Sequence, residues 1–255
     1  MKNHNALLAF VKCATCIVLV FFSTLTKAKP EKIYLVEVVI FENLNSKALH
    51  ETWPLNPGSP NIYKAKTLHT LALEQQNKEG NTQGFIELEP NAFQLNDAEK
   101  RIQQQGNYRI IAHKAWRQPI QSKEKAENIR FYGGRFYRTH LSNEALSDDP
   151  QNATSQSSDL PSYEIDGVLK LSKSRYLHLK ADLSFTKPMR VLTSISGPNQ
   201  AVSLAQVNNT QHWENEPNAR LQPFRLNQSV RIRMNEVHYV DHPMFGMLIT
   251  VLPED

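Results

Sequence analysis

The chain has 255 residues, enough for one large domain or two small ones, with 29 Lys and Arg against 25 Asp and Glu. Three of the 29 lie in the first 28 residues, which carry no acid, so the remainder is close to neutral with 26 basic residues. Such a balance gives no reason to expect a nucleic-acid partner. Both cysteines, Cys13 and Cys16, lie in that first segment, so the remainder has no disulfide, thiol nucleophile or thiolate metal site.

The first 28 residues are typical of a cleavable signal peptide. Cys13–Leu25 is a continuous apolar run, and Thr26–Ala28 supplies small residues at the positions that a signal peptidase reads, which predicts cleavage after Ala28. An uncleaved membrane anchor is the alternative, but Lys12 shortens the run below the roughly 20 residues that a spanning helix needs. Exported eukaryotic domains usually carry disulfides, so we expect a bacterial periplasmic protein without a membrane segment after cleavage.

The mature chain begins with a predicted strand. Ile33–Glu42 is rich in β-branched and aromatic residues, and only Glu37 interrupts its apolar run, which is typical of a central strand buried on both faces. Trp53–Pro60 follows as a loop, because its prolines and glycine exclude a helix.

One helix is predicted before the next strand. Asn96 can cap it, with Glu99 three residues on as in a capping box, and Gly106 ends it. Its apolar face consists of Leu95, Ala98 and Ile102.

The strand that follows ends at Pro119, and the alternation places four of its residues on one face: Tyr108, Ile110, Ala112 and Trp116. Further on, Phe131–Tyr137, with its two glycines, predicts a tight turn between aromatic residues.

Two hairpins are predicted in the second half. Glu164–Ser172 and Arg175–Phe185 are joined by a short connection, and the second of these strands alternates apolar and polar residues as a half-exposed antiparallel strand does. Ser229–Tyr239 and Phe245–Leu252 form the other candidate hairpin.

Polar residues 142–162 predict a disordered insertion. The sequence therefore predicts one α+β domain over 29–255, mainly antiparallel sheet with one helix packed on it and long polar loops.

His238, Asp241 and His242 have a spacing that could hold a metal. The flanks predict strands, however, and Pro243 disfavours helical geometry at His242. A catalytic zinc site needs three protein ligands and an open position. The simpler interpretation is a hairpin turn in which Asp241 accepts local backbone N–H bonds and Pro243 restricts the backbone, with His238 and Tyr239 at the end of the strand. We expect no metal, no cofactor and no catalytic residue here.

Arginines offer a candidate binding surface. Arg231 and Arg233 lie on one face of a predicted strand, opposite Val230, Ile232 and Met234, and basic residues also surround the turn of the other hairpin. Arginines on an open sheet face can bind carboxylates bidentately. The alternative is an ordinary solvated face, paired with acids such as Glu236.

Trp116, Arg117 and Gln118 form a second candidate. An aromatic face can stack on a sugar ring, and the two polar neighbours could bond to hydroxyl or amide groups. The alternative is that Trp116 belongs to the core, since the residues with which it alternates are apolar.

The segment from Arg231 to Gly246, RIRMNEVHYVDHPMFG, carries a specific pattern. It resembles the signature R-x-R-x-x-E-[LV]-H-Y-[LV]-D-H-P-x-F-G of the CsiV family, bacterial periplasmic proteins described as peptidoglycan-binding. The blocks YLVEVVIFEN, NYRIIAHKAWRQP and RYLHLKADL also resemble that family, so the likeness covers most of the mature chain in order.

The resemblance implies a non-catalytic accessory factor for cell-wall biogenesis and cell shape. Such a factor would bind peptidoglycan and support a bifunctional class A penicillin-binding protein. The resemblance assigns no binding residue, so the candidate residues above rest on physical reasoning. A metal-dependent envelope hydrolase that uses His238 and His242 is the alternative function.

Overall fold

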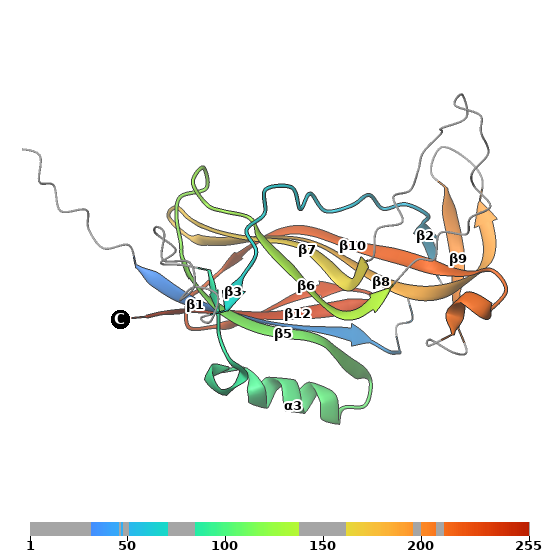
Figure 1. The fold of residues 1–255 in the computed structure, drawn as a ribbon, viewed down its shortest axis with the longest axis horizontal. Coiled ribbons are helices and arrows are strands. Elements are labelled where there is room, and N and C mark those ends of the chain that lie inside the picture. The colour runs from blue at the N-terminus through green and yellow to red at the C-terminus, as the bar shows by residue number, and fades with distance from the viewer. Residues whose placement is uncertain are drawn as a thin grey trace, which may run out of the picture. The chain divides into compact units, whose positions relative to one another are not determined.

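The computed structural model describes residues 32–45, 47, 51–70, 85–137, 162–195, 200–207 and 212–254. The expected signal peptide, residues 1–28, lies outside them, as does the expected insertion apart from Ser162. Within the described residues the chain forms two six-stranded sheets (Figure 1). The first sheet has the order β11-β12-β1-β5-β4-β3, and the second has the order β2-β9-β8-β7-β6, with β10 paired to β8.

The strands of the first sheet are β1 (Ile33–Asn43), β3 (His69–Thr70), β4 (Ile86–Glu87), β5 (Tyr108–Pro119), β11 (Val237–His242) and β12 (Phe245–Pro253). Those of the second sheet are β2 (Thr52–Pro54), β6 (Ile129–Tyr137), β7 (Ser162–Lys173), β8 (Leu177–Ile195), β9 (Ala201–Gln206) and β10 (Ala219–Ile232). The helix α3 (Asn96–Gln104) and two 3₁₀ turns, η3 (Pro90–Ala92) and η5 (Trp213–Asn215), complete the fold. Except for the short parallel pair β3–β4, the strand pairs are antiparallel, which confirms the predicted class.

The core lies between the two sheets, and β1 is buried on both of its faces. Val36, Val38 and Ile40 join the main core with residues of β7, β8, β10 and β12. On the opposite face of β1, Val39 and Phe41 pack against the helical side, where α3 lies (Figure 1). The predicted central strand is therefore confirmed, and the reason is that β1 pairs with β12 on one edge and β5 on the other.

The strand β5 contains a bulge that the alternation did not reveal. Ile40 pairs with Ala112 and Phe41 pairs with Ile110, so Ile111 is an extra residue. Tyr108 and Ile110 consequently face the helical side, whereas Ala112 and Trp116 face the main core. The prediction that these four side chains share one face is wrong, because a bulge reverses the alternation beyond it.

The predicted helix is present, but its start is stabilised differently. The residue before its first turn is Leu95, and no side chain caps it locally. Instead, the buried Glu37 carboxylate of β1 accepts the backbone N–H groups of Gln94 and Leu95, each at 2.8 Å. The capping role expected of Asn96 is thus taken by a residue distant in sequence. The apolar face of Leu95, Ala98 and Ile102 packs on the sheet as expected.

The segment Phe131–Tyr137 is part of the strand β6 and not a tight turn. Its glycines allow β5 and β6 to approach closely, because a Cβ at Gly133 would lie 2.9 Å from the Cβ of Ala112. Gly134 has φ +76°, a conformation that favours glycine, and the pairing of β6 with β7 shifts register beyond Gly133. A second bulge therefore accompanies the close contact between the sheets.

Of the two predicted hairpins, one is complete. β7 and β8 pair antiparallel, with Lys173 opposite Leu177. The strand expected at Ser229–Tyr239 is instead interrupted after Ile232, and Asn235 adopts φ +60° in the turn. Its first part, β10, pairs with β8 in the second sheet, and only β11 pairs with β12. A change of sheets inside one apparent strand separates the two halves of the predicted hairpin.

Candidate functional site

Basic side chains gather on the outer face of the second sheet, near the β7–β8 turn. β8 pairs with β7 and β10, which aligns Lys170 with Lys180 and His178 with Arg231. Paired residues point to the same face, and here that face is opposite the core. We use the term basic face for Lys170, Arg175, Lys180 and Arg231, together with Tyr176 and His178. All of them except Lys170 are exposed, and Lys170 is half-buried.

Two arginines of the basic face share one aromatic ring. The guanidinium carbon of Arg231 lies 3.2 Å from the ring centroid of Tyr176, and that of Arg175 lies 5.5 Å away. Within the described part of the chain, neither arginine forms an ion pair with an acid. Stacking orients a guanidinium plane while its N–H donors stay available at the edge, so this arrangement can receive carboxylates.

Arg233 lies two residues beyond Arg231, in the turn after β10. Its side chain is 70% exposed and lies 3.5 Å from Glu236. An exposed pair of this kind contributes no more than about 1 kcal/mol. Arg233 can therefore exchange Glu236 for another carboxylate at little cost.

Trp116, Arg117 and Gln118 do not form a surface site. Trp116 is fully buried, and its indole N–H donates to the side-chain oxygen of Gln118 at 2.7 Å. Gln118 is itself buried. Arg117 points to the opposite face of β5 and pairs with Glu254 at 2.7 Å. A buried ring cannot stack on a sugar, so the core interpretation of Trp116 is correct. The alternation with apolar residues was the signal for it.

The signature turn joins β11 to β12 through Pro243 and Met244. Its backbone is held by His242, whose Nδ1 accepts the N–H of Met244 at 3.1 Å. The ring packs between Trp53 and Phe245, and this burial lowers the pKa of His242 to about 4, so the imidazole is a neutral acceptor. Asp241 was expected to bind the turn's backbone. It accepts instead the hydroxyl of Tyr239 at 2.6 Å.

Gly246 of the signature is explained by two aromatic rings. Phe41 and Tyr239 stack with centroids 6.1 Å apart and planes at 10°. A Cβ at Gly246 would lie 2.6 Å from the Phe41 ring and 2.7 Å from the Tyr239 ring. The glycine therefore leaves the space in which this stack forms, next to Asp241 and the turn.

His238 and His242 are not placed to share a metal. They lie four residues apart on β11, which at strand rise corresponds to about 13 Å, whereas two nitrogen ligands of one zinc each lie about 2 Å from it. The Nε2 atom of His238 accepts the backbone N–H of Arg233 at 2.8 Å. In the described ranges no group of three or more His, Cys, Asp or Glu residues is arranged to hold a metal ion.

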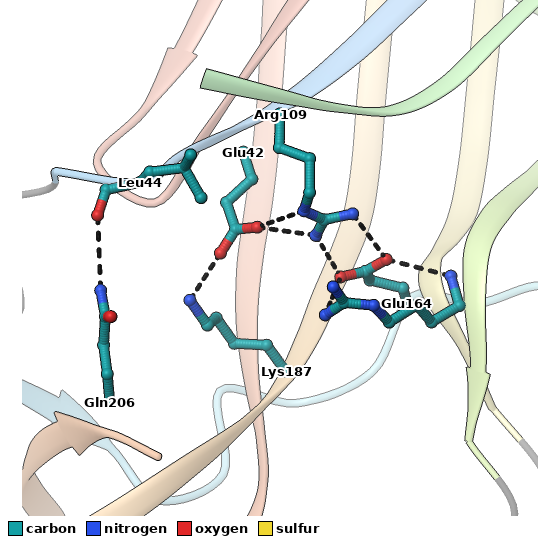
Figure 2. Close-up of polar contacts among 7 residues, drawn as sticks. Glu42, Leu44, Arg109, Glu164, Lys187 and Gln206 are labelled. Atoms are coloured by element: carbon teal, nitrogen blue, oxygen red, sulfur yellow. Dashed lines mark hydrogen bonds and ion pairs between the residues drawn. The ribbon is translucent and has the colours of Figure 1, made fainter. Parts of the chain in front are cut away.

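A buried network of charges, which the sequence did not indicate, connects the two sheets. Figure 2 shows Glu42 of β1 between Arg109 of β5 and Lys187 of β8, with Glu164 of β7 on the other side of Arg109. Glu164 also accepts the backbone N–H of Arg135 at 3.0 Å. Burial by itself would raise the pKa of Glu42, but Lys187 and Arg109 outweigh it and hold that pKa below its ordinary value. Each carboxylate is thus neutralised by cations, which is the arrangement of a structural clamp.

A second polar cluster attaches α3 to the first sheet. His113 of β5 lies between Glu37 and Glu99, with 2.7 Å from each ring nitrogen to a carboxylate oxygen. Burial would lower the pKa of His113, but the hydrogen bonds to Glu37 and Glu99 outweigh it and raise the pKa above its ordinary value. Protonated His113 therefore joins a helix residue to a buried strand residue.

Comparison with known proteins identifies the same family that the signature segment resembles. No curated protein and no solved structure matches the chain. No helix of the described residues is long and apolar enough to cross a membrane. The family described as "Peptidoglycan-binding protein, CsiV" matches residues 12–253, which is nearly the whole chain. The chain therefore belongs to the CsiV family of peptidoglycan-binding proteins.

Proposed function

We propose that this protein is a non-catalytic periplasmic factor that binds peptidoglycan through the basic face and supports a class A penicillin-binding protein. The family supports the peptidoglycan part of the proposal and an envelope location. The synthase partner rests on the family resemblance described above. The proposal includes a mature chain of one domain that starts at Lys29 after signal cleavage.

The observation that carries the binding proposal is the pair of arginines on Tyr176. Peptidoglycan consists of glycan strands with short peptides that carry free carboxylates. Arg231 and Arg175 have no acidic partner among the described residues, so a carboxylate can bind them without first displacing another. The mature chain is close to neutral overall, so electrostatic attraction to a polyanionic wall must come from a local cluster of cations such as this one.

The test is a pull-down of purified mature protein with purified sacculi. We expect Arg231→Glu combined with Arg233→Glu to weaken binding at least tenfold. A charge-assisted hydrogen bond contributes roughly 1.5–3 kcal/mol, so the loss of one or two exceeds the 1.4 kcal/mol that corresponds to a decade. Added salt should partly relieve the repulsion in the variant, because the Debye length is about 8 Å at physiological ionic strength.

A matched control reverses two other exposed cations, Lys100 and Arg101, which lie on α3. It changes the net charge by the same amount but leaves the basic face intact, and it should bind sacculi like the wild type. If the Arg231 and Arg233 variant also binds like the wild type at low salt, the basic face is only a solvated surface. Metal analysis of the same preparations tests the hydrolase alternative, which requires a tightly held stoichiometric zinc.

A further inference from the structure

Three aromatic side chains gather at the edge of the second sheet, away from the β7–β8 turn. The ring of Tyr163 on β7 lies 4.7 Å from that of Tyr132 and 5.1 Å from that of Phe136, both on β6. Phe136 is 46% exposed, and the two tyrosines are half-buried. We use the term aromatic platform for these three residues. A large exposed phenylalanine whose ring packs against that of Tyr163 does not serve the core, which lies on the opposite side of the sheet.

A planar pair of polar side chains lies beside the platform. Arg130 donates to both carboxylate oxygens of Asp166, at 3.1 and 2.8 Å, and its guanidinium carbon is 5.2 Å from the Tyr132 centroid. Asp166 pairs with Tyr132 across the strands, so the pair and the platform share one face. Both side chains remain partly exposed, at 33% and 23%. Hydrogen-bond donors and acceptors are thus fixed at the rim of an apolar surface.

This combination fits the chemistry of a sugar better than that of a peptide carboxylate. A pyranose ring has a face of C–H groups, which packs on an aromatic ring, and a rim of hydroxyls that both donate and accept. Arg130 is already neutralised by Asp166, and Lys114, whose Nζ lies 5.4 Å from the Tyr132 centroid, is neutralised by Glu87. Among the described residues the platform therefore offers no free cation comparable with Arg231. A neutral, ring-shaped ligand with hydroxyls is therefore favoured here, and an anionic one is favoured at the basic face.

We propose that the aromatic platform binds the glycan strand of peptidoglycan, while the basic face binds its peptide carboxylates. This inference rests on the proposed function and assigns the sugar part of it to a separate site. Asp166 and Lys170 lie on the same face of β7, four residues apart, which corresponds to about 13 Å. Both sites therefore belong to the outer side of one sheet.

The test uses two probes: intact sacculi, and peptide-free glycan strands, released by an amidase, whose remaining lactyl carboxylates have been converted to neutral amides. Wild-type protein should bind both. Phe136→Ala combined with Tyr132→Ala should weaken binding to peptide-free strands at least tenfold, whereas Phe136→Trp should retain it because a flat ring is restored. The Arg231 and Arg233 reversal should bind the peptide-free strands as the wild type does, and only its binding to intact sacculi should be weakened.

Tyr239→Ala is the matched control, because it removes another exposed aromatic ring, from the first sheet. It should leave binding to the peptide-free strands unchanged. Thermal unfolding of every variant is measured, so that binding is compared only between proteins that are folded at the temperature of the binding assay. The inference is overturned if the wild type binds intact sacculi but not peptide-free strands, or if the Phe136 and Tyr132 variant binds those strands normally. If the wild type binds neither probe, the proposed function itself fails.

Discussion

The substitution Gly246→Ala tests whether the signature motif encodes packing of the first sheet. The added Cβ would lie 2.6 Å from the buried Phe41 ring and 2.7 Å from the Tyr239 ring. Contacts this short do not occur in proteins, so at least one ring must move. Because Tyr239 is 56% exposed and Phe41 is packed beneath it, the substitution should disturb the 6.1 Å stack between them.

The expected magnitude is the difference between two effects. Insertion of a methyl group into a packed site costs about 1–3 kcal/mol. Replacement of glycine by alanine restricts the unfolded chain, which contributes about 0.4–1 kcal/mol of stability where the native backbone allows it, and the backbone at Gly246 is not in the left-handed region. We therefore expect a net loss of about 0.5–2 kcal/mol. For a domain of this size the midpoint of thermal unfolding should fall by about 1–8 °C.

Urea unfolding of a double-mutant cycle with Phe41→Leu measures the clash directly. Leucine lacks the far ring atoms that the new Cβ would meet, so Gly246→Ala should cost less in the Phe41→Leu background. A coupling energy of about 0.5–3 kcal/mol is typical of residues in contact. If the two changes are additive to within about 0.5 kcal/mol, or if Gly246→Ala alone stabilises the protein, the packing explanation of this glycine is refuted.

Two further predictions concern the buried charges. The folded-state pKa of His113 is raised, so its contribution to stability is complete below the unfolded value of about 6.5 and is lost as pH rises through the folded value. The midpoint of thermal unfolding of the wild type should thus fall more steeply than that of His113→Gln as pH rises above about 6.5, while the exposed His178→Gln should follow the wild type. Glu42→Gln leaves two partly buried cations, Lys187 and Arg109, with less negative charge around them. In urea titrations it should lower the free energy of unfolding by about 3–5 kcal/mol. Glu236→Gln, which removes the acid of an exposed pair, should lower it by less than about 1 kcal/mol. Equal losses in those two variants would contradict the clamp.

The features that the sequence predicted correctly depend on neighbours along the chain. An apolar run on both faces marked β1 as a central strand, and spacing of three and four residues marked the apolar face of α3. A short polar connection joined β7 to β8. The signature in Arg231–Gly246 led to the family, because a long specific pattern does not depend on knowledge of the fold. The burial of Trp116 in the core was one of the two interpretations that its alternation with apolar residues allowed.

The features that the sequence did not reveal depend on partners distant along the chain. A bulge at Ile111 reverses the faces of β5, and the choice between sheets separates β10 from β11. Glu37 replaces a local cap only because β1 passes beneath the start of α3. Arg231 and Tyr176, 55 residues apart, meet because β10 pairs with β8. The sequence by itself thus determined the family and the elements with a clear local pattern, such as β1, α3 and the β7–β8 hairpin. The tertiary structure decided the remaining elements and the pairing of strands, because that pairing minimises the exposure of apolar faces over the whole chain.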